Sequence, residues 1–345
     1  MPVSTETARP GHRKAVSVRR QAAIAGDRMR NPPLARTLRR IGGEGRDGFY
    51  TGPVMQDIVA RLQALGGLHE EEDFIGHCSD WVEPISVRYR GFDVYECPPN
   101  GHGLAALLIL GILEGYPMGS DDFGEADRLH IFAEATKAAY AVRDAFVCDP
   151  GHVPVDTARF LSDAWAEETR RQISLERAAE ATACLGIEHK NTTYLCVVDR
   201  DGNAISLINS LFFSFGSGIL APESGVLLHN RGTGFQLIPG HPNAIAPRKR
   251  PLHTIIPGML CKEGRAVMPF GIVGGHYQAA GHAHFLHRML DCGMDPQQAA
   301  EAPRCFAKPR AVLEVERTPS SPSWHVAATR SKWPIRRSAG VKQSG

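Results

Sequence analysis

The stretch N-T-T-Y-L-C-V-V-D-R-D-G-N-A-I-S-L-I-N-S, residues 191–210, has the pattern of a β-hairpin. Two runs rich in apolar and β-branched residues flank Arg-Asp-Gly-Asn at 200–203, and an Asp-Gly step is a strong signal for a tight turn between strands. Helical patterns precede this hairpin, a further hairpin follows it, and helices return near the end of the chain. This order predicts an α+β fold in which helices are layered on antiparallel sheets.

The other elements are predicted from hydrophobic periodicity and from turn and capping residues. Alternating apolar and polar residues predict a pair of strands over 84–95. A second hairpin is expected around Lys-Glu-Gly-Arg at 262–265, between the segments 252–261 and 266–275. Helices are expected to begin at Asn31 and to cover the segments 56–65, 104–113, 126–147, 157–173, 279–290 and, capped by Asp295, 296–304.

Composition argues against several classes of function. The 345 residues carry a net charge of +2, so no electrostatic field favours a nucleic acid as partner. The best apolar run, 104–115, is too short to span a bilayer and carries Glu114, so no membrane partner is expected. The eight cysteines include no Cys-x-x-Cys pair, which argues against a zinc or redox site. Because no apolar signal segment is seen, a cytoplasmic location is expected.

Few residues qualify as a nucleophile. No Gly-x-Ser-x-Gly or His-Glu-x-x-His pattern is present, and His282, His284 and His287 lack an acidic ligand at useful spacing. Packed or surface histidines are therefore expected there, and no metal. Thr192 can act as a nucleophile if its own α-amine serves as the base, which requires the chain to be cut after Asn191. Taken alone, however, a Thr-Thr pair at the start of a strand is explained by β-propensity.

Several long motifs resemble the γ-glutamyltransferase family, in the order and spacing of that family. The segments similar to its small subunit are 191–232, A-P-R-K-R-P-L-H-T-I-I-P-G at 246–258, G-I-V-G-G-H at 271–276 and D-P-Q-Q-A-A-E-A-P-R at 295–304. The segments similar to the second half of its large subunit are 31–54, 85–103 and 134–150. The resemblance implies an N-terminal-nucleophile (Ntn) hydrolase with an αββα sandwich. It also implies a zymogen that cuts itself into two fragments that stay associated, with no cofactor.

The resemblance also implies roles for individual residues. Thr192 is the nucleophile, freed by cleavage of the Asn191–Thr192 bond. The hydroxyls of Thr193 and Ser210 support the new amine. The amides of Gly274 and Gly275 form the oxyanion hole, which suits glycine because its backbone can approach the acyl oxygen closely. From the residues alone, this glycine pair is better explained as a turn after a strand.

The resemblance and the composition together predict that the chain is divided into four regions. Residues 31–191 correspond to the large-subunit part and residues 192–316 to the small-subunit part that begins with the nucleophile. Residues 1–30 and 317–345 lack sustained periodicity and are expected to be basic, poorly ordered tails.

The pocket departs from the family pattern at several positions. The family's Asn, Gln and Asp contacts to a glutamyl α-amino group fall on Phe212, Arg231 and Gly234. Its serine pair at the α-carboxylate falls on His253 and Thr254, which are expected to bind substrate together with Arg231. The loss of the Asp removes the partner of an ammonium, and the gain of Arg231 favours a carboxylate. A purely structural role also explains Arg231.

Three functions are therefore expected. The first is hydrolysis or transfer of γ-glutamyl amides such as glutathione, through an acyl-enzyme on Thr192. The second is an amidohydrolase or acylase for small acidic acyl amides, glutaryl- or oxamate-like, that need no α-amine. The third is a non-catalytic remnant, because the family's large subunit extends upstream of Asn31. That upstream part holds strands and a carboxylate-binding arginine, so the sandwich is expected to be incomplete, with exposed sheet edges.

Overall fold

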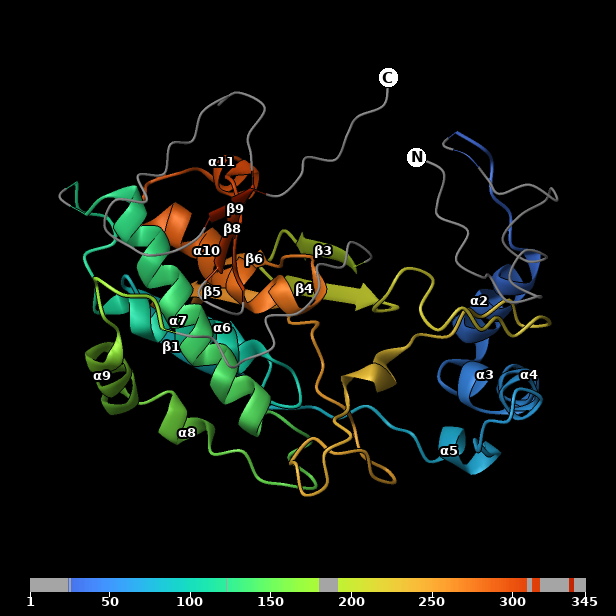
Figure 1. The fold of residues 1–345 in the computed structure, drawn as a ribbon. Helices are drawn as coiled ribbons and strands as arrows, with labels where there is room; N and C mark the ends of the chain where they lie inside the picture. The colour runs from blue at the N-terminus through green and yellow to red at the C-terminus, as the bar shows by residue number, and fades with distance from the viewer. Residues whose placement is uncertain are drawn as a thin grey trace. The chain divides into compact units, whose positions relative to one another are not determined.

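The computed structural model describes residues 24, 26–121, 123–179, 192–308, 312–316 and 335–337. By their contacts the residues form two compact units, Met1–Trp81 with Leu211–Asn230 and Val82–Ser210 with Arg231–Gly345 (Figure 1). Both helices and antiparallel sheets are present, as the predicted α+β class requires. No helix within the described ranges is long and apolar enough to cross a bilayer.

The first unit is a cluster of short helices joined to the loop 211–230. Its helices are α2 (Pro32–Glu44), α3 (Asp47–Tyr50), α4 (Gly52–Gln63) and α5 (Glu71–Ile75). Asn31 caps α2 as predicted, since its Oδ1 accepts a hydrogen bond from the Leu34 amide at 3.1 Å. Asp57 on α4 fixes the loop, because its carboxylate accepts from the amide and the hydroxyl of Ser224 at 2.7 and 2.6 Å. A small apolar core joins α4 to the loop and consists of Val54, Ile58 and Ala221.

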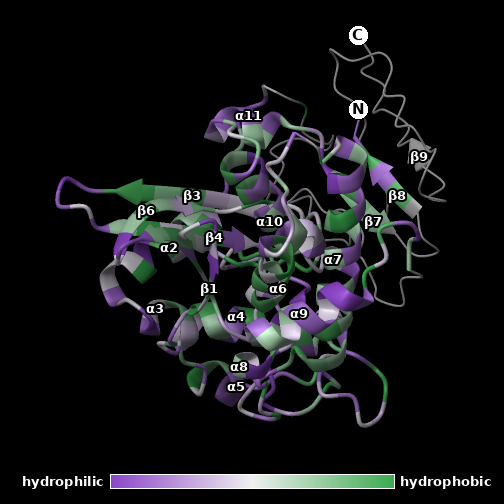
Figure 2. Cartoon of the chain, turned by 90° about the vertical axis from the view of Figure 1, so that its left-hand side faces the viewer, coloured by the Kyte–Doolittle hydropathy of each residue, from purple (hydrophilic) through white to green (hydrophobic). Residues whose placement is uncertain are grey.

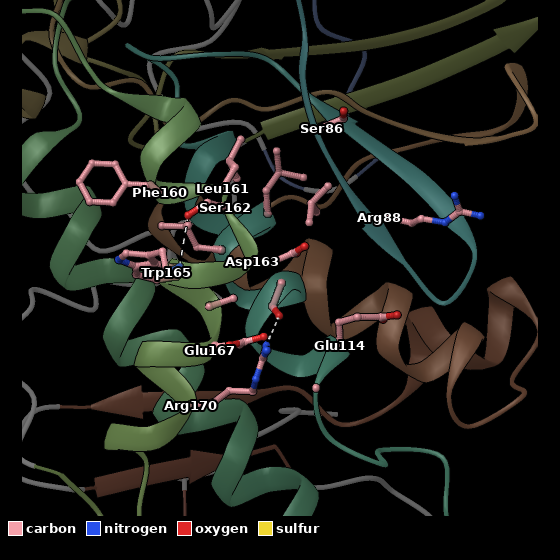
Figure 3. Close-up of a pocket in the computed structure, with 16 residues that line it drawn as sticks. Ser86, Arg88, Glu114, Phe160, Leu161, Ser162, Asp163, Trp165, Glu167 and Arg170 are labelled. Atoms are coloured by element: carbon pink, nitrogen blue, oxygen red, sulfur yellow. Dashed lines mark hydrogen bonds between the residues drawn. The ribbon is translucent and has the colours of Figure 1, made fainter.

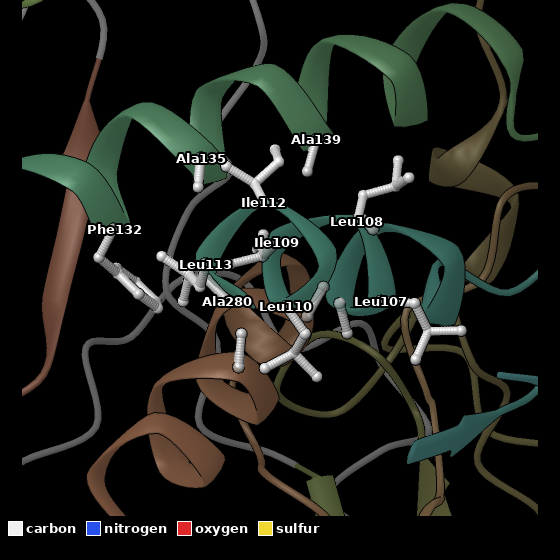
Figure 4. Packing of buried hydrophobic residues seen from close by; sticks show 14 of the residues in the cluster. Leu107, Leu108, Ile109, Leu110, Ile112, Leu113, Phe132, Ala135, Ala139 and Ala280 are labelled. Carbon is white, nitrogen blue, oxygen red and sulfur yellow. The ribbon is translucent and has the colours of Figure 1, made fainter. Parts of the chain in front are cut away.

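The core of the second unit is built around one apolar helix, α6 (Gly103–Glu114). Its residues from Gly103 to Leu110 are all buried, so no face of this part of the helix meets water. The helices α7 (Glu125–Phe146) and α10 (Gln278–Leu290) pack against it (Figure 4). Both long helices predicted here are confirmed to within one residue. Each buried Leu or Ile contributes about 1.5–3 kcal/mol, so α6 supplies much of the apolar stabilisation of this unit.

The helix α6 lies on an antiparallel sheet with the strand order β1-β2-β5-β6. The strands β1 (Ile85–Tyr89) and β2 (Phe92–Glu96) form the first predicted hairpin, and β5 (Gly258–Lys262) and β6 (Arg265–Phe270) form the second. The second hairpin turns at Glu263 and Gly264, which both have positive φ, as a tight two-residue turn requires. Its strands are shorter than predicted, because Pro257 has no amide to donate to a ladder and the chain leaves the sheet after Phe270.

The hairpin of residues 191–210 forms a separate two-stranded ribbon of β3 (Thr192–Val198) and β4 (Ala204–Ser210). Leu195 pairs with Leu207 and Val197 pairs with Ile205 on one face of this ribbon. These four side chains are 45–57% exposed, so they form an apolar patch open to solvent. Figure 2 shows hydrophobic colouring along β3. The other face of the ribbon is attached to β6, since the Ser206 hydroxyl donates to the Phe270 carbonyl at 3.2 Å.

The remaining elements include one correction to the predicted helices. In place of a single helix over 157–173 there are two, α8 (Thr157–Phe160) and α9 (Asp163–Gln172). Ser162 separates them, because its side chain accepts from the Trp165 amide at 3.2 Å and so begins a new helix. The other elements are α11 (Pro296–Glu301), capped by Asp295 as predicted, the short turns η1 (Arg231–Gly234) and η2 (Gly275–Tyr277), and the sheet of β7 (Cys305–Lys308), β8 (Val312–Val315) and β9 (Ile335–Arg337).

A buried Glu–His pair fixes the loop between β6 and α10. Glu96 ends β2, and its Oε1 lies 2.5 Å from Nδ1 of His282 on α10, with both side chains buried. Nε2 of His282 accepts a hydrogen bond from the Ile272 amide at 3.1 Å. Because Nε2 is an acceptor, Nδ1 carries the proton of the ring and donates it to Glu96. Burial raises the pKa of the Glu96 carboxyl, and the His282 ring opposes that rise. One side chain thus joins β2, α10 and the loop 271–276.

We predict that His282→Ala lowers the free energy of unfolding by about 3 kcal/mol, because it leaves the Glu96 carboxyl and the Ile272 amide buried without a partner. Urea unfolding of the purified chain measures this. His69→Ala, at an exposed histidine, is the control and should change the free energy of unfolding by less than about 0.5 kcal/mol. A loss below about 1 kcal/mol for His282→Ala, with an unchanged slope on urea, would show that the pair does not hold the loop.

Candidate functional site

The predicted nucleophile lies at the open end of the β3–β4 ribbon. Thr192 is the first residue of β3 and is paired directly with Ser210, the last residue of β4. The Thr192 hydroxyl donates to Oγ of Ser210 at 3.3 Å. Both residues are half-buried. Asn191, the other residue of the predicted cleavage bond, lies outside the described residues.

Thr193 lies on the other face of the ribbon. Successive side chains of a strand point to opposite faces, so Thr193 shares the exposed face with Leu195 while Thr192 shares the inner face with Tyr194. Thr193 is itself exposed and pairs with Asn209. The structure therefore brings Ser210 to the predicted nucleophile and places Thr193 apart from it.

The predicted oxyanion glycines lie in the loop 271–276, between β6 and α10. Gly274 has a φ of 141° and Gly275 a φ of 58°, conformations that favour glycine over other residues. Gly275 begins η2, which leads directly into α10. Amides at the start of a helix have no acceptor within the helix and are available to an anion. The positive φ values and the position before α10 are compatible with the predicted oxyanion hole, which stays a prediction.

Tyr194 brings the ribbon and the glycine loop together. A Cβ atom on Gly271 would lie 2.3 Å from the Tyr194 ring, so only glycine at 271 lets the ring pack on the backbone there. The Tyr194 hydroxyl lies 3.1 Å from Oγ of Ser206, and that hydroxyl in turn donates to the Phe270 carbonyl. Burial raises the pKa of Tyr194 to about 12, so its hydroxyl stays protonated at neutral pH. Because Thr192 shares a face with Tyr194, it lies on the side of the ribbon that meets this loop.

Two of the predicted substrate-binding residues contact each other. Arg231 is only 5% exposed, and its Nη2 donates to the Thr254 hydroxyl at 3.0 Å. Burial lowers the pKa of Arg231 to about 10, so the side chain keeps its charge at neutral pH. The third residue, His253, is hydrogen-bonded to the neighbouring backbone. Its Nδ1 accepts from the Ile255 amide at 3.2 Å, and its own amide donates to the Asn100 carbonyl at 2.8 Å.

His102 belongs to the same cluster and was not predicted. Its Nε2 lies 2.9 Å from the Thr254 carbonyl, and the residue is fully buried. Burial, with the charge of Arg143, lowers the pKa of His102 well below its usual value, so the ring is neutral. A neutral ring that donates from Nε2 leaves Nδ1 as an acceptor, and Nδ1 has no hydrogen-bond partner among the described residues. In the sequence, His102 is marked only by its place at the end of the segment 85–103, which resembles the family's large subunit.

Gly234, at the position of the family's aspartate, has no room for a side chain unless the neighbouring backbone shifts. A Cβ atom on Gly234 would lie 2.6 Å from the Leu252 carbonyl oxygen, which is backbone and cannot move aside easily. The Gly234 carbonyl is itself held by the Asn243 side-chain amide at 2.7 Å. Phe212, at the position of the family's asparagine, belongs to the other unit, where it is buried and stacked on Phe213.

A pocket of about 350 Å³ lies elsewhere in the second unit, between β1, α6, α8 and α9 (Figure 3). The pocket is lined by both basic and acidic side chains, among them Arg88, Glu114 and Asp163. Arg170 also lines the pocket, and its Nη1 donates a hydrogen bond to the Gly111 carbonyl at 2.9 Å. None of the predicted site residues lines it. Among the described residues, no group of three or more His, Cys, Asp or Glu side chains is placed to hold a metal ion.

Comparisons with known proteins agree with these features. The family model described as Gamma-glutamyltranspeptidase matches residues 5–328. The chain is 38% identical over 286 residues to the glutathione hydrolase-like YwrD proenzyme of Bacillus subtilis, covering 83% of this chain and 54% of that protein. It is 33% identical to the oxamate amidohydrolase proenzyme of Klebsiella pneumoniae, covering 86% of this chain and 55% of that protein.

The fold has solved counterparts as well. The crystal structure of cephalosporin acylase from Bacillus halodurans superposes with a TM-score of 0.82 at 36% identity, covering 89% of this chain and 56% of that chain. These matches confirm the predicted resemblance and the Ntn-hydrolase type of fold. The chain spans about half the length of the curated relatives it matches. By the family model and by these relatives, the chain belongs to the gamma-glutamyltranspeptidase family.

Proposed function

We propose that this chain hydrolyses amides of small acidic acyl groups, or transfers the acyl group, through an acyl-enzyme on Thr192. The observation that carries the proposal is the placement of Thr192 at the end of a strand, hydrogen-bonded to Ser210, on the face that meets the glycine loop. Proenzymes are named among the relatives, which supports release of Thr192 by self-cleavage. The two fragments would then stay associated through the shared core of the second unit.

Self-cleavage supplies the base for the reaction. A threonine hydroxyl is a weak nucleophile until a nearby group takes its proton, and an α-amine has a pKa close to neutrality. Cutting the Asn191–Thr192 bond places such an amine on the nucleophile itself. Ser210 accepts the hydrogen bond of the Thr192 hydroxyl and so fixes its rotamer before the attack.

The glycine loop is the proposed site of charge stabilisation. Attack of Oγ1 on an amide carbonyl forms a tetrahedral intermediate whose oxygen carries the new charge. Amides of Gly274 and Gly275, at the start of η2, can donate to that oxygen. The pair Glu96–His282 holds the loop at Ile272, so the donors need no rearrangement when charge develops. Collapse of the intermediate expels the amine, and water or a second amine then releases the acyl group.

The choice of acyl group follows from Arg231 and Gly234. The close approach of the Leu252 carbonyl to Gly234 leaves no space for a carboxylate that would pair with an α-ammonium. A buried, charged Arg231 favours an acceptor-rich group such as a carboxylate. These two features favour a glutaryl- or oxamate-like acid over a γ-glutamyl group such as that of glutathione. A non-catalytic role is the remaining alternative.

We predict that the purified chain yields two fragments, one of which begins at Thr192, because the nucleophile needs its own amine. Intact-mass spectrometry after prolonged incubation measures the cleavage. Thr192→Ala should remain one chain, and Thr192→Ser, which keeps a hydroxyl, is the matched control and should still be cut. A wild-type chain that stays at its full mass would favour the non-catalytic alternative.

We predict that Arg231→Gln raises KM for a glutaryl anilide by about 10- to 100-fold, since a hydrogen bond to a charged group is worth about 1.5–3 kcal/mol. The kcat for a neutral butyryl anilide should change little, because Arg231 acts on recognition and not on the reacting carbonyl. Steady-state kinetics on the cleaved protein test this. Equal losses for both anilides, or a fall in melting temperature with unchanged kinetics, would make Arg231 a structural residue.

A further inference from the structure

A Cys–His–Asp arrangement lies in the turn that follows α10, and the proposed amidase chemistry does not use it. Cys292 Sγ lies 3.9 Å from Nε2 of His287, and Nδ1 of His287 lies 2.8 Å from Oδ2 of Asp291. His287 is buried and Cys292 is half-buried. The three residues sit at positions i, i+4 and i+5, so the end of the helix itself places the imidazole between the carboxylate and the sulfur.

The carboxylate of this group is fixed from outside the helix. Asp291 Oδ1 accepts from Nε of Arg90 at 2.6 Å, and Oδ2 accepts from the Tyr89 hydroxyl. Burial alone would raise the pKa of Asp291, but the hydrogen bonds from His287, Tyr89 and Arg90 hold it below its usual value. The carboxylate is therefore charged at neutral pH and orients the His287 ring through Nδ1.

The sulfur faces a cationic neighbourhood. Burial by itself lowers the pKa of His287, yet the hydrogen bond to Asp291 raises it overall. The hydrogen bond with His287 lowers the pKa of Cys292, and the charge of Arg288 adds to that effect. The carbonyl end of α10 opposes a thiolate there, since a helix C-terminus carries partial negative charge. The imidazolium offsets this.

The other charged groups around the site form ion pairs. Arg288 on α10 is bound to Glu125 of α7, with Nη2 at 2.7 Å from Oε1. Arg90 pairs with Glu114 of α6 at 3.0 Å as well as with Asp291. Neither Glu125 nor Glu114 is bonded to the sulfur in these contacts, so the charged groups that act on Cys292 are His287 and Arg288.

The group is separate from the proposed active site. The glycine loop precedes the first residue of α10, whereas Cys292 follows its last residue. The helix has 13 residues, and at 1.5 Å per residue its ends lie about 20 Å apart. Chemistry at Cys292 is thus independent of Thr192.

We propose that Cys292, activated by His287 and Asp291, is a nucleophilic thiol and a site of covalent modification by small electrophiles, with hydroperoxides as the natural class. The thiolate attacks one oxygen of the peroxide, so that an S–O bond forms and the O–O bond breaks. The leaving oxygen takes the proton of the His287 imidazolium. For hydrogen peroxide the products are a cysteine sulfenic acid, water and a neutral His287. The sulfur is oxidised and the peroxide reduced.

The test is a pulse of iodoacetamide on the folded full-length chain at pH 6 to 9, with the alkylated cysteines quantified peptide by peptide. Cys78 and Cys196 are internal controls because both are exposed. An ordinary thiol has a pKa near 8.5 and is almost wholly protonated at pH 6. We expect Cys292 to be alkylated about tenfold faster than either control at pH 6. Between pH 6 and pH 9 its alkylation rate should rise less than the rates of Cys78 and Cys196. After brief hydrogen peroxide treatment, dimedone should mark Cys292.

Two variants of α10 separate activation from packing. His287→Gln should slow the alkylation of Cys292 at pH 6 by about tenfold and leave it unchanged at pH 9. His284→Gln is the matched control, since His284 is buried on the same helix and a glutamine can still accept the hydrogen bond that Nε2 of His284 receives from Nε of Arg288 at 3.2 Å. It should leave the profile of Cys292 unchanged. If either variant fails to fold, the pH dependence of Cys292 alkylation in the wild-type chain tests the proposal by itself. A wild-type Cys292 that follows the pH curve of Cys78, or that peroxide leaves without a dimedone adduct, would overturn the proposal.

Discussion

The hydrogen bond between Glu96 and His282 is the interaction on which the second unit depends most. It joins the end of β2 to α10, and through Nε2 of the same ring it holds the amide of Ile272 in the glycine loop. An isolated carboxylate at this depth is costly, so Glu96 is tolerated there only because the imidazole lies against it. The end of β2 is therefore held to α10 and to the loop that precedes α10, and this contact fixes the glycine loop at Ile272.

Local sequence signals were enough to predict most of the second unit's elements. The helices α6 and α7 were found to within one residue, because an unbroken apolar run and a long amphipathic period leave few alternatives. The Asp-Gly step predicted the β3–β4 hairpin but not its register, because residues 199–203 connect the strands and a two-residue turn at 201–202 would pair Thr192 with Leu211. The error over 157–173 came from Ser162, whose side chain can cap a helix as well as sit inside one.

The contacts that build the site could not be predicted in this way. Glu96 and His282 are 186 positions apart, and His102 and Thr254 are 152 positions apart. No periodicity or local motif relates residues at such separations. The packing of Tyr194 on Gly271 is equally long-range, and in the sequence it looks like any aromatic residue in a strand. The roles of Thr192, Thr193, Ser210, Gly274 and Gly275 came from the family resemblance and stay predictions, as does the boundary between residues 191 and 192.

The exposed apolar patch on β3 and β4 lies on the same ribbon as the proposed nucleophile. Leu195, Val197, Ile205 and Leu207 form cross-strand apolar pairs that sheets normally bury. The inner face of the same ribbon carries Thr192 and meets the glycine loop through Tyr194. The strand that carries the proposed nucleophile is thus packed against the glycine loop on one face and exposed to solvent on the other.

The central claim is that Thr192 forms the acyl-enzyme, and trapping that intermediate tests it most directly. The cleaved protein would be mixed with excess glutaryl anilide, quenched in acid within the first turnover, digested and mapped by mass spectrometry. The mass of one glutaryl group on the peptide that begins with Thr192 is the predicted result. A glutaryl group on another side chain, or anilide turnover with no acylated peptide, would contradict the claim.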